Sequence, residues 1–310
     1  MYSGYNPVLG RRQSMDKKRS SLILRSLAKA VVTVALIAFV LTTAIAALHA
    51  QRWRIVMMRL GTMMDFLTAV RLVLIGYFFN QTLPSAMGGD AFRVWGTYRS
   101  GIALTTAASS VIIDRFVALL SLMVMIAVGM RWLFDLITEP LARSLVVLVV
   151  ACGFVGLAVL LALNVIGSRL ESWRATRFLL SVAAGTRAVF TSARATIAVA
   201  SLTITGYVVA SWVVHLLAAG LAIDFGVGQA LLLIPLVTLV TVLPVSIGGW
   251  GLRESAMVVA LGLIGVPAIA AFSLSVLYGL VVLASGIPGG VIWLMSRRPR
   301  PADAKTQALS

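Results

Sequence analysis

Long apolar runs, separated by short polar and basic stretches, dominate the sequence. Six long stretches contain no Asp, Glu, Lys or Arg: residues 30–50, 72–89, 144–168, 195–223, 225–252 and 255–296. A membrane-spanning helix needs about 20 mostly apolar residues, and a water-soluble core does not require such runs. The pattern therefore predicts an all-α, polytopic transmembrane helical bundle with about six to eight spans.

The predicted spans differ in length. Complete spans are predicted over residues 27–48, 113–130, 145–166, 197–222 and 268–295. Residues 102–130 allow two alternatives: one long span, or a short packing helix over 103–111 and a span that starts near Asp114. The apolar stretch 254–265 covers only about 18 Å, too little for a hydrocarbon core about 30 Å thick. We expect it to form a half-helix or a re-entrant segment.

Other stretches are predicted to lie at the membrane surface. Arg52, Trp53 and Arg54 follow the first span and are interpreted as interface anchors, because Trp and Arg gather at headgroup level. Residues 55–68 interleave Met with charged residues, which favours a short interfacial helix. Residues 169–194 alternate charge with apolar residues and are predicted to form an amphipathic hairpin on the surface.

Two further apolar stretches, residues 69–83 and 229–243, end in the same motif. It reads Leu-Pro, three residues, Gly-Gly, three residues, Arg, over 83–93 and again over 243–253. Pro removes a backbone donor and Gly frees the backbone, so helices are expected to end or break here. Three complete spans separate the copies, and an odd number of crossings inverts the second copy. Such an inverted repeat of two broken elements predicts a transport site where the copies meet.

The composition is that of a membrane protein with basic ends. Mean hydropathy is +1.00, and 12% of residues are charged, about half the share of a soluble domain. Although the net charge is +16, basic residues cluster in tails over 1–24 and 297–310 that flank a transmembrane domain over 25–296. This placement suits anionic headgroups, so no nucleic-acid partner is expected. A cytoplasmic N-terminus would leave Arg52, Arg54 and Arg59 on the opposite side, so the orientation stays open.

Polar residues near the motifs are the candidate substrate-binding residues. They are Asn80, Gly88, Gly89, Asp90, Arg93, Asp114, Arg115, Gly248, Gly249, Arg253 and Glu254. A charge in hydrocarbon costs at least about 2.5–3.5 kcal/mol, so such residues persist when they pair or line a wet cavity. We expect Arg93 and Arg253 to hold a lipid phosphate. Asp90, Asp114 and Glu254 are expected to pair with arginines when no lipid is bound, or to contact a cationic headgroup.

Two of these groups also allow a simpler structural interpretation. The Gly-Gly pairs can serve only to let helices pack closely. Asp114 and Arg115 can form a structural ion pair. Of the two arginines and three carboxylates, we rank Asp90 and Arg93 first, because only the first motif has aspartate directly after Gly-Gly.

Enzyme signatures are missing from the sequence. It contains no Walker-type phosphate loop, no His-Glu-x-x-His and no Gly-x-Ser-x-Gly. With two histidines and one cysteine, Cys152, a zinc site is not expected. We therefore expect no catalytic residue, no metal and no cofactor.

Taken in order, the motifs resemble a known family. Residues 76–80, the two Leu-Pro-x-x-x-Gly-Gly motifs with their charged residues, and Asp114-Arg115 are similar to the lysylphosphatidylglycerol synthase transmembrane region family. Arg52-Trp53-Arg54 also looks like that family's Arg-Trp signature. The resemblance covers about residues 27–295. It implies a flippase-like domain of the cytoplasmic membrane that moves lipids or lipid-linked molecules between leaflets. The family's additional early span and its synthase domain have no counterpart here, so lysylphosphatidylglycerol synthesis is not expected.

The leading hypothesis is a flippase-like transporter of the cell (cytoplasmic or inner) membrane. Its expected partners are membrane lipids, either anionic or aminoacylated phospholipids or polyprenyl-phosphate-linked molecules. The alternative is a non-transporting accessory subunit that docks a lipid-modifying or envelope-synthesis enzyme through its basic tails and surface hairpin. A third option, a membrane-embedded lipid transferase, requires a carboxylate pair at the interface.

Overall fold

The computed structural model describes residues 7–83, 88–166, 174–242, 246 and 248–296. Every regular element in these ranges is an α-helix, which confirms the predicted fold class. The predicted C-terminal tail and the Leu-Pro step of the second motif lie outside the described residues, as does the proline of the first motif.

Within the described ranges, five helical segments are long and apolar enough to cross a membrane. They belong to α1 (Pro7–Arg59), α4 (Leu104–Leu136), α5 (Pro140–Ile166), α7 (Ala193–Gly220) and α10 (Ala268–Ser285) with α11 (Ile287–Ser296). The candidate span in α1 is Val32–Arg59. Helix α4 is continuous, so the alternative with a separate helix over 103–111 is wrong.

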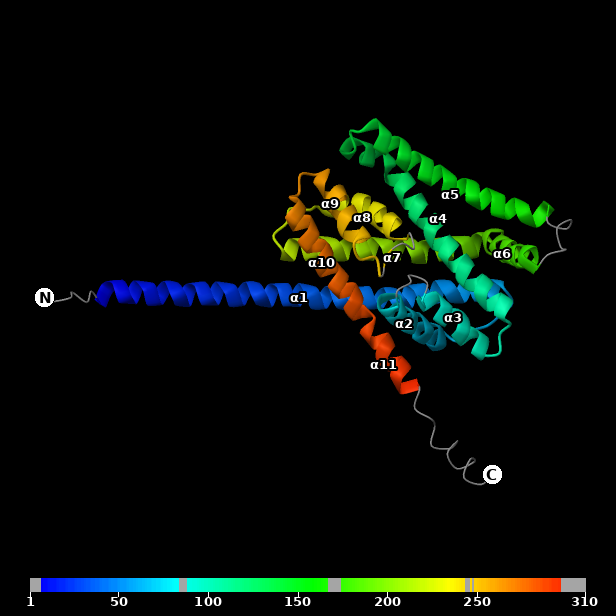
Figure 1. The fold of residues 1–310 in the computed structure, drawn as a ribbon, viewed down its shortest axis with the longest axis horizontal. Coiled ribbons are helices and arrows are strands. Elements are labelled where there is room, and N and C mark those ends of the chain that lie inside the picture. The colour runs from blue at the N-terminus through cyan, green and yellow to red at the C-terminus, as the bar shows by residue number, and fades with distance from the viewer. Residues whose placement is uncertain (1–6, 84–87, 167–173, 243–245, 247, 297–310) are drawn as a thin grey trace, which may run out of the picture.

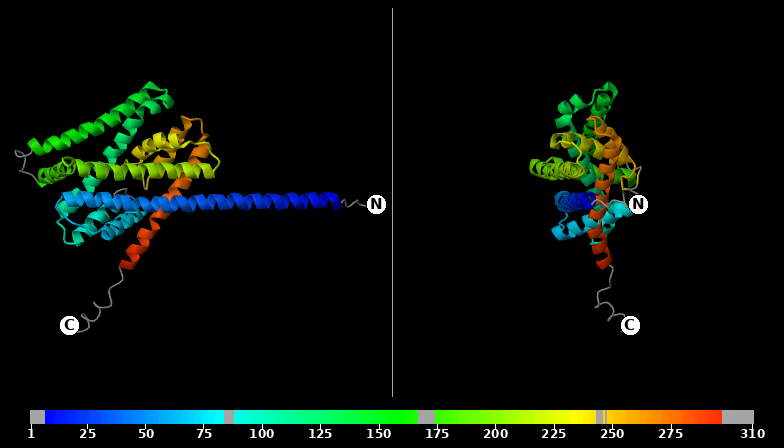
Figure 2. Two further views of the ribbon diagram at one scale, coloured as in Figure 1. Left: turned by 180° about the vertical axis from the view of Figure 1, so that it is seen from behind. Right: turned by 90° about the vertical axis from the view of Figure 1, so that its left-hand side faces the viewer.

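The long helices cross one another in a bundle. Figure 1 shows α1 and α7 running side by side, with α10 crossing them, α11 continuing beyond α1 towards α2, and α5 on the outer side of α4. The N-terminal part of α1 extends beyond the other helices in Figure 1 and in the left view of Figure 2. The largest apolar core lies between α4, α7, α8, α9 and α10, where Leu122, Leu217, Leu233, Met257 and Leu274 are almost fully buried.

Each motif connects the two helices of a helical hairpin. The first hairpin pairs α2 (Phe66–Thr82) with α3 (Gly88–Arg99), and the second pairs α8 (Val227–Thr241) with α9 (Leu252–Gly262). Helix α9 has 11 residues and is about 16 Å long, as expected of a half-helix. Helices α2 and α8 are also shorter than the five long segments, with 17 and 15 residues.

The glycines of the two hairpins have different structural roles. A Cβ on Gly89 would lie 2.1 Å from the carbonyl oxygen of Gly76, so this glycine lets α2 and α3 approach closely. In the second copy, Gly248 and Gly249 have φ of +58° and +82°, a conformation that only glycine adopts readily. The packing interpretation therefore accounts for Gly89, and backbone conformation accounts for Gly248 and Gly249.

Two predicted surface elements are wrong. Residues 55–68 do not form a separate interfacial helix: α1 continues to Arg59 with Met57 fully buried, and α2 begins at Phe66. The Asp65 carboxylate caps α2 by accepting from the Leu67 and Thr68 backbone. In place of a hairpin, residues 174–190 form one helix, α6 (Arg174–Phe190), because its apolar side packs against α4 and α5.

Candidate functional site

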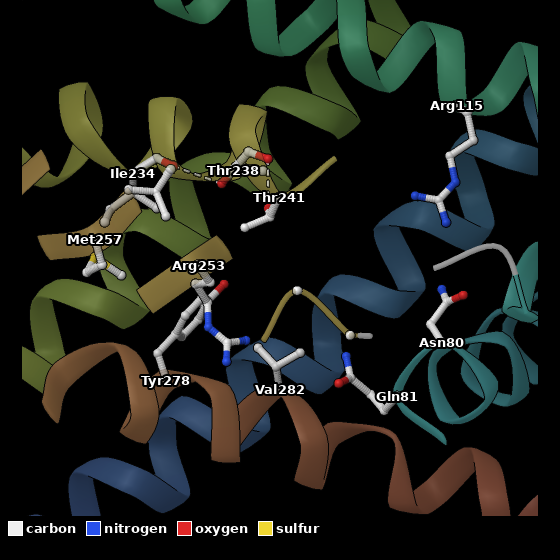
Figure 3. A pocket seen from close by; sticks show the side chains of 13 residues that line it. Asn80, Gln81, Arg115, Ile234, Thr238, Thr241, Arg253, Met257, Tyr278 and Val282 are labelled. Carbon is white, nitrogen blue, oxygen red and sulfur yellow. Dashed lines mark hydrogen bonds between the residues drawn. The ribbon is translucent and has the colours of Figure 1, made fainter. Parts of the chain in front are cut away.

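A polar cavity of about 230 Å³ lies where the tips of the two hairpins meet (Figure 3). Asn80 and Gln81 line it from the first hairpin, and Gly248, Gly249 and Arg253 line it from the second. Arg115 on α4 extends into the same space from the opposite side to Arg253 (Figure 3). Segments about 160 residues apart in the sequence thus build one site.

Two adjoining cavities extend this site along the interior of the bundle. A cavity of about 460 Å³ reaches past Asp90 and Asp114, and one of about 260 Å³ reaches past Tyr207 and Tyr278. Asn80 and Thr238 line all three. The three cavities therefore adjoin one another at Asn80 and Thr238, and most of the predicted site residues line one of them.

A chain of ion pairs forms one wall of the larger cavity. Arg52 Nε and Nη2 donate to the Asp114 carboxylate at 2.7 and 3.0 Å, and Arg93 Nη2 donates to the same carboxylate at 2.9 Å. Arg93 Nη1 also reaches Asp90 at 3.4 Å, and Arg115 Nε donates to Asp90 at 2.6 Å. Asp114 and Arg115 therefore pair with other residues rather than with each other.

Exposure increases along this chain of ion pairs. The Asp114 side chain is 1% exposed, whereas that of Arg115 is 51% exposed. Three guanidinium groups face two carboxylates, which leaves one positive charge. Because Arg115 is the exposed end, this surplus charge is available at the cavity surface. Arg93, which we rank first from sequence, is engaged by both carboxylates and lies over the Trp53 ring at 4.2 Å.

The second motif holds its arginine in a local pair. Arg253 Nε and Nη2 donate to Glu254 Oε1 at 3.2 and 2.8 Å. The backbone N–H of Gly251 donates to the other Glu254 oxygen, and Ser275 Oγ donates to Oε1 at 3.3 Å. The Arg253 guanidinium lies 4.7 Å from the Trp250 ring centroid. Each motif arginine thus pairs with a carboxylate and lies near a tryptophan ring.

The structure brings most of the predicted residues to this region but not all. Asn80, Arg115, Gly248, Gly249 and Arg253 line the first cavity, and Asp90, Arg93 and Asp114 line the second. Glu254 lines a groove on the other face of the second motif. Gly88 and Gly89 lie in the packed contact between α2 and α3, beside Leu83 and Gly76.

Arg52 and Trp53 are not interface anchors. Arg52 is 4% exposed and Trp53 is fully buried, with its indole N–H donating to Ser110 Oγ at 3.1 Å. The pairing with Asp114 offsets the desolvation of Arg52, so the arginine lies inside the bundle and the Trp beside it packs there too. One indication of this was present in the sequence. A cytoplasmic N-terminus would leave Arg52 on the opposite side of the membrane, and burial in an ion pair removes that conflict for Arg52.

Sequence reasoning also missed a histidine and two tyrosines. His49 and Tyr77 line both adjoining cavities, and the Tyr77 hydroxyl lies 2.5 Å from His49 Nδ1. Tyr207 lines the same cavities and donates to the Ala118 carbonyl at 3.1 Å. His49 and Arg52 follow the predicted span over 27–48, and only the continuation of α1 to Arg59 places them on one helix, three residues apart and on a shared face.

These features define a multi-pass helical membrane protein whose interior holds a polar, arginine-lined cavity between two helical hairpins. The sequence profile described as the lysylphosphatidylglycerol synthase TM region matches residues 16–289, and the chain belongs to this family. No curated protein and no solved structure matches the chain significantly.

Proposed function

We propose that this chain is a flippase-like transporter that moves a phospholipid or lipid-linked molecule between the leaflets of the cytoplasmic membrane. The observation that carries the proposal is the polar cavity at the meeting point of both motif hairpins, inside a bundle of apolar spans. A headgroup that crosses hydrocarbon needs polar partners at that depth. The arginines and amides of the cavity supply them. The proposed activity is transport without chemical change to the lipid.

The order of the spans supports access from both leaflets. Three candidate spans, in α4, α5 and α7, lie between the two hairpins. An odd number of crossings gives the second hairpin the opposite orientation to the first. In transporters with inverted repeats, rocking of one half against the other opens a central site to each side in turn. We assign the two hairpins to these two halves.

The second motif also lies beside an open groove. An open groove of about 630 Å³ between α9 and α10 is lined by Trp250, Gly251 and Glu254 at the motif and by Val258 and Phe272 further along. Residues 248–254 thus separate an apolar groove from the polar cavity. We assign the acyl chains to this groove, so that only the headgroup crosses the motif.

Leaflet exchange in reconstituted vesicles tests the proposal. The purified chain is reconstituted with phospholipids that carry a fluorescent acyl chain, and the fraction accessible to an external quencher is followed. Vesicles with the wild-type chain are expected to exchange lipid between leaflets faster than empty vesicles. Arg115→Gln is expected to lose most of this increase in rate. Arg131→Gln is the matched control, because Arg131 is an exposed arginine on the same helix.

Equal exchange for wild type, Arg115→Gln and empty vesicles would remove the proposal. A stable partner enzyme that co-purifies with a chain inactive in exchange would favour the accessory-subunit hypothesis instead. Mass spectrometry of the vesicle lipids separates both outcomes from a transferase, because a transferase changes the mass of its lipid.

A further inference from the structure

The three carboxylates of the site are all occupied by arginines. Asp114 accepts from Arg52 and Arg93, with one oxygen taken by Arg52 and the other shared. Asp90 accepts from Arg93 on one oxygen and from Arg115 on the other. The same saturation holds at the second motif, where both Glu254 oxygens have donors. A cationic headgroup would therefore have to compete with an arginine at each of these carboxylates.

Donors, in contrast, remain available to a ligand. Arg115 is half exposed and, among the described residues, only its Nε has a partner. Arg253 uses Nε and Nη2 on Glu254, and its guanidinium points into the cavity (Figure 3). Arg93, more than nine-tenths buried, lines the second cavity with an Nε that has no acceptor in the described residues. Guanidinium groups are well matched to phosphate oxygens.

The charge balance of the site also favours an anionic ligand. Four arginines, Arg52, Arg93, Arg115 and Arg253, share three carboxylates, which leaves one positive charge in the site. Arg115 lies well inside the 33-residue helix α4, about 16 Å from its first residue at 1.5 Å per residue. An unbalanced charge within a bundle of apolar spans is unfavourable. A singly anionic headgroup would neutralise it, whereas a cationic one would double the imbalance.

A neutral acceptor in the same cavity favours a headgroup with hydroxyl groups. The Gln81 Oε1 atom is buried and has no donor among the described residues, although its side chain lines two of the three cavities. A buried acceptor without a donor costs free energy, and a ligand hydroxyl can satisfy it. Gln81 lies beside Gly248, so the acceptor is at the junction of the two motifs.

We infer that the site selects an anionic phosphate headgroup with neutral hydroxyl groups, such as phosphoglycerol, over a headgroup that carries a cationic aminoacyl group. This inference rests on the proposed function, since it names the substrate class of the same cavity. It makes Arg115 the residue that determines the charge of the cargo. Asp90, Asp114 and Glu254 position the arginines and do not contact the headgroup.

Competitive lipid binding tests the inference without requiring transport. The purified chain in detergent is mixed with equal amounts of phosphatidylglycerol, lysylphosphatidylglycerol and phosphatidylcholine, and the bound lipids are counted by native mass spectrometry. Phosphatidylglycerol is expected to exceed lysylphosphatidylglycerol by about tenfold. Arg115→Gln should reduce phosphatidylglycerol binding by about tenfold, the loss typical of one charge-assisted contact. Arg131→Gln should leave binding unchanged.

A charge-reversal variant provides the second measurement. Arg115→Glu should make lysylphosphatidylglycerol the preferred lipid, and retention of the helical circular dichroism spectrum shows that it folds. Equal binding of the two lipids by wild type, an equal loss for Arg131→Gln, or full competition by soluble glycerol phosphate would each overturn the inference. Wild-type preference for phosphatidylglycerol without any leaflet exchange would refute the proposed transport instead, so the two failures are distinguishable.

Discussion

Replacing Asp114 by Asn tests the ion-pair chain at its most buried point. Asp114 is 1% exposed and accepts three hydrogen bonds from Arg52 and Arg93. Asparagine keeps the volume but loses the charge, and its amide NH₂ would face a guanidinium donor. Removing one partner of a buried ion pair costs about 3–5 kcal/mol, because the remaining charge is left uncompensated. Two arginines are left here, so the loss is expected in the upper half of that range.

The assay is reversible unfolding in mixed detergent micelles, followed by circular dichroism. The Asp114→Asn variant should lose about 4–5 kcal/mol of unfolding free energy, and Arg131→Gln about 0.5 kcal/mol or less. The double variant Arg52→Gln/Asp114→Asn should be more stable than the sum of the single losses predicts, because the two residues interact directly. Near wild-type stability for Asp114→Asn, or strict additivity in the double variant, would refute the ion-pair account.

Two glycine substitutions test the packing around the motifs. Gly89→Ala places a Cβ 2.1 Å from the Gly76 carbonyl oxygen and should lower the unfolding free energy by about 1–3 kcal/mol. The control is Gly156→Ala, whose Cβ meets nothing within 4 Å and which should raise the unfolding free energy by about 0.5–1 kcal/mol. Equal effects of the two substitutions would contradict the packing role of Gly89. Gly279→Ala places a Cβ 2.1 Å from Arg253 Nη2 and should reduce lipid exchange severalfold with little loss of helical signal, and unchanged exchange would show that the position of Arg253 does not matter.

The positions of the helix breaks could be predicted from the sequence. Proline and paired glycines interrupt apolar runs at two matching points, and the structure has a hairpin tip at each. The shortness of helix α9 could be predicted from the length of the apolar stretch 254–265 alone. These features are local, so composition and spacing are sufficient to find them. The prediction of a surface hairpin was wrong because hydrophobic periodicity does not distinguish contact with a membrane surface from contact with a neighbouring helix such as α4.

The partners of the buried charges could not be predicted from the sequence. Arg52 and Trp53 at the end of an apolar run have the signature of an interface anchor, and only Asp114, 62 residues away, changes that interpretation. Asp114 and Arg115 are neighbours in sequence, but consecutive residues point about 100° apart around a helix. Their different partners depend on how α4 is rotated against α1 and α3, which no local pattern specifies.

The two copies of the motif also differ in a way that their spacing conceals. Arg93 joins a chain of ion pairs that spans α1, α3 and α4, whereas Arg253 pairs with the adjacent Glu254. The ion pairs of the first copy therefore join three helices, whereas Arg253 and Glu254 are neighbours on α9, with Ser275 of α10 as a further donor to Glu254.

The most direct test of the central claim is a reversible cross-link across the cavity. Gln81 and Thr241 line it from different hairpins and are replaced by cysteine in a Cys152→Ser background. A reducible bis-thiosulfonate linker is applied, and lipid exchange is measured before and after reduction. The account predicts that the linked protein exchanges lipid no faster than empty vesicles and that reduction restores the rate. Unchanged exchange in fully linked protein would show that lipids do not cross between the two hairpins.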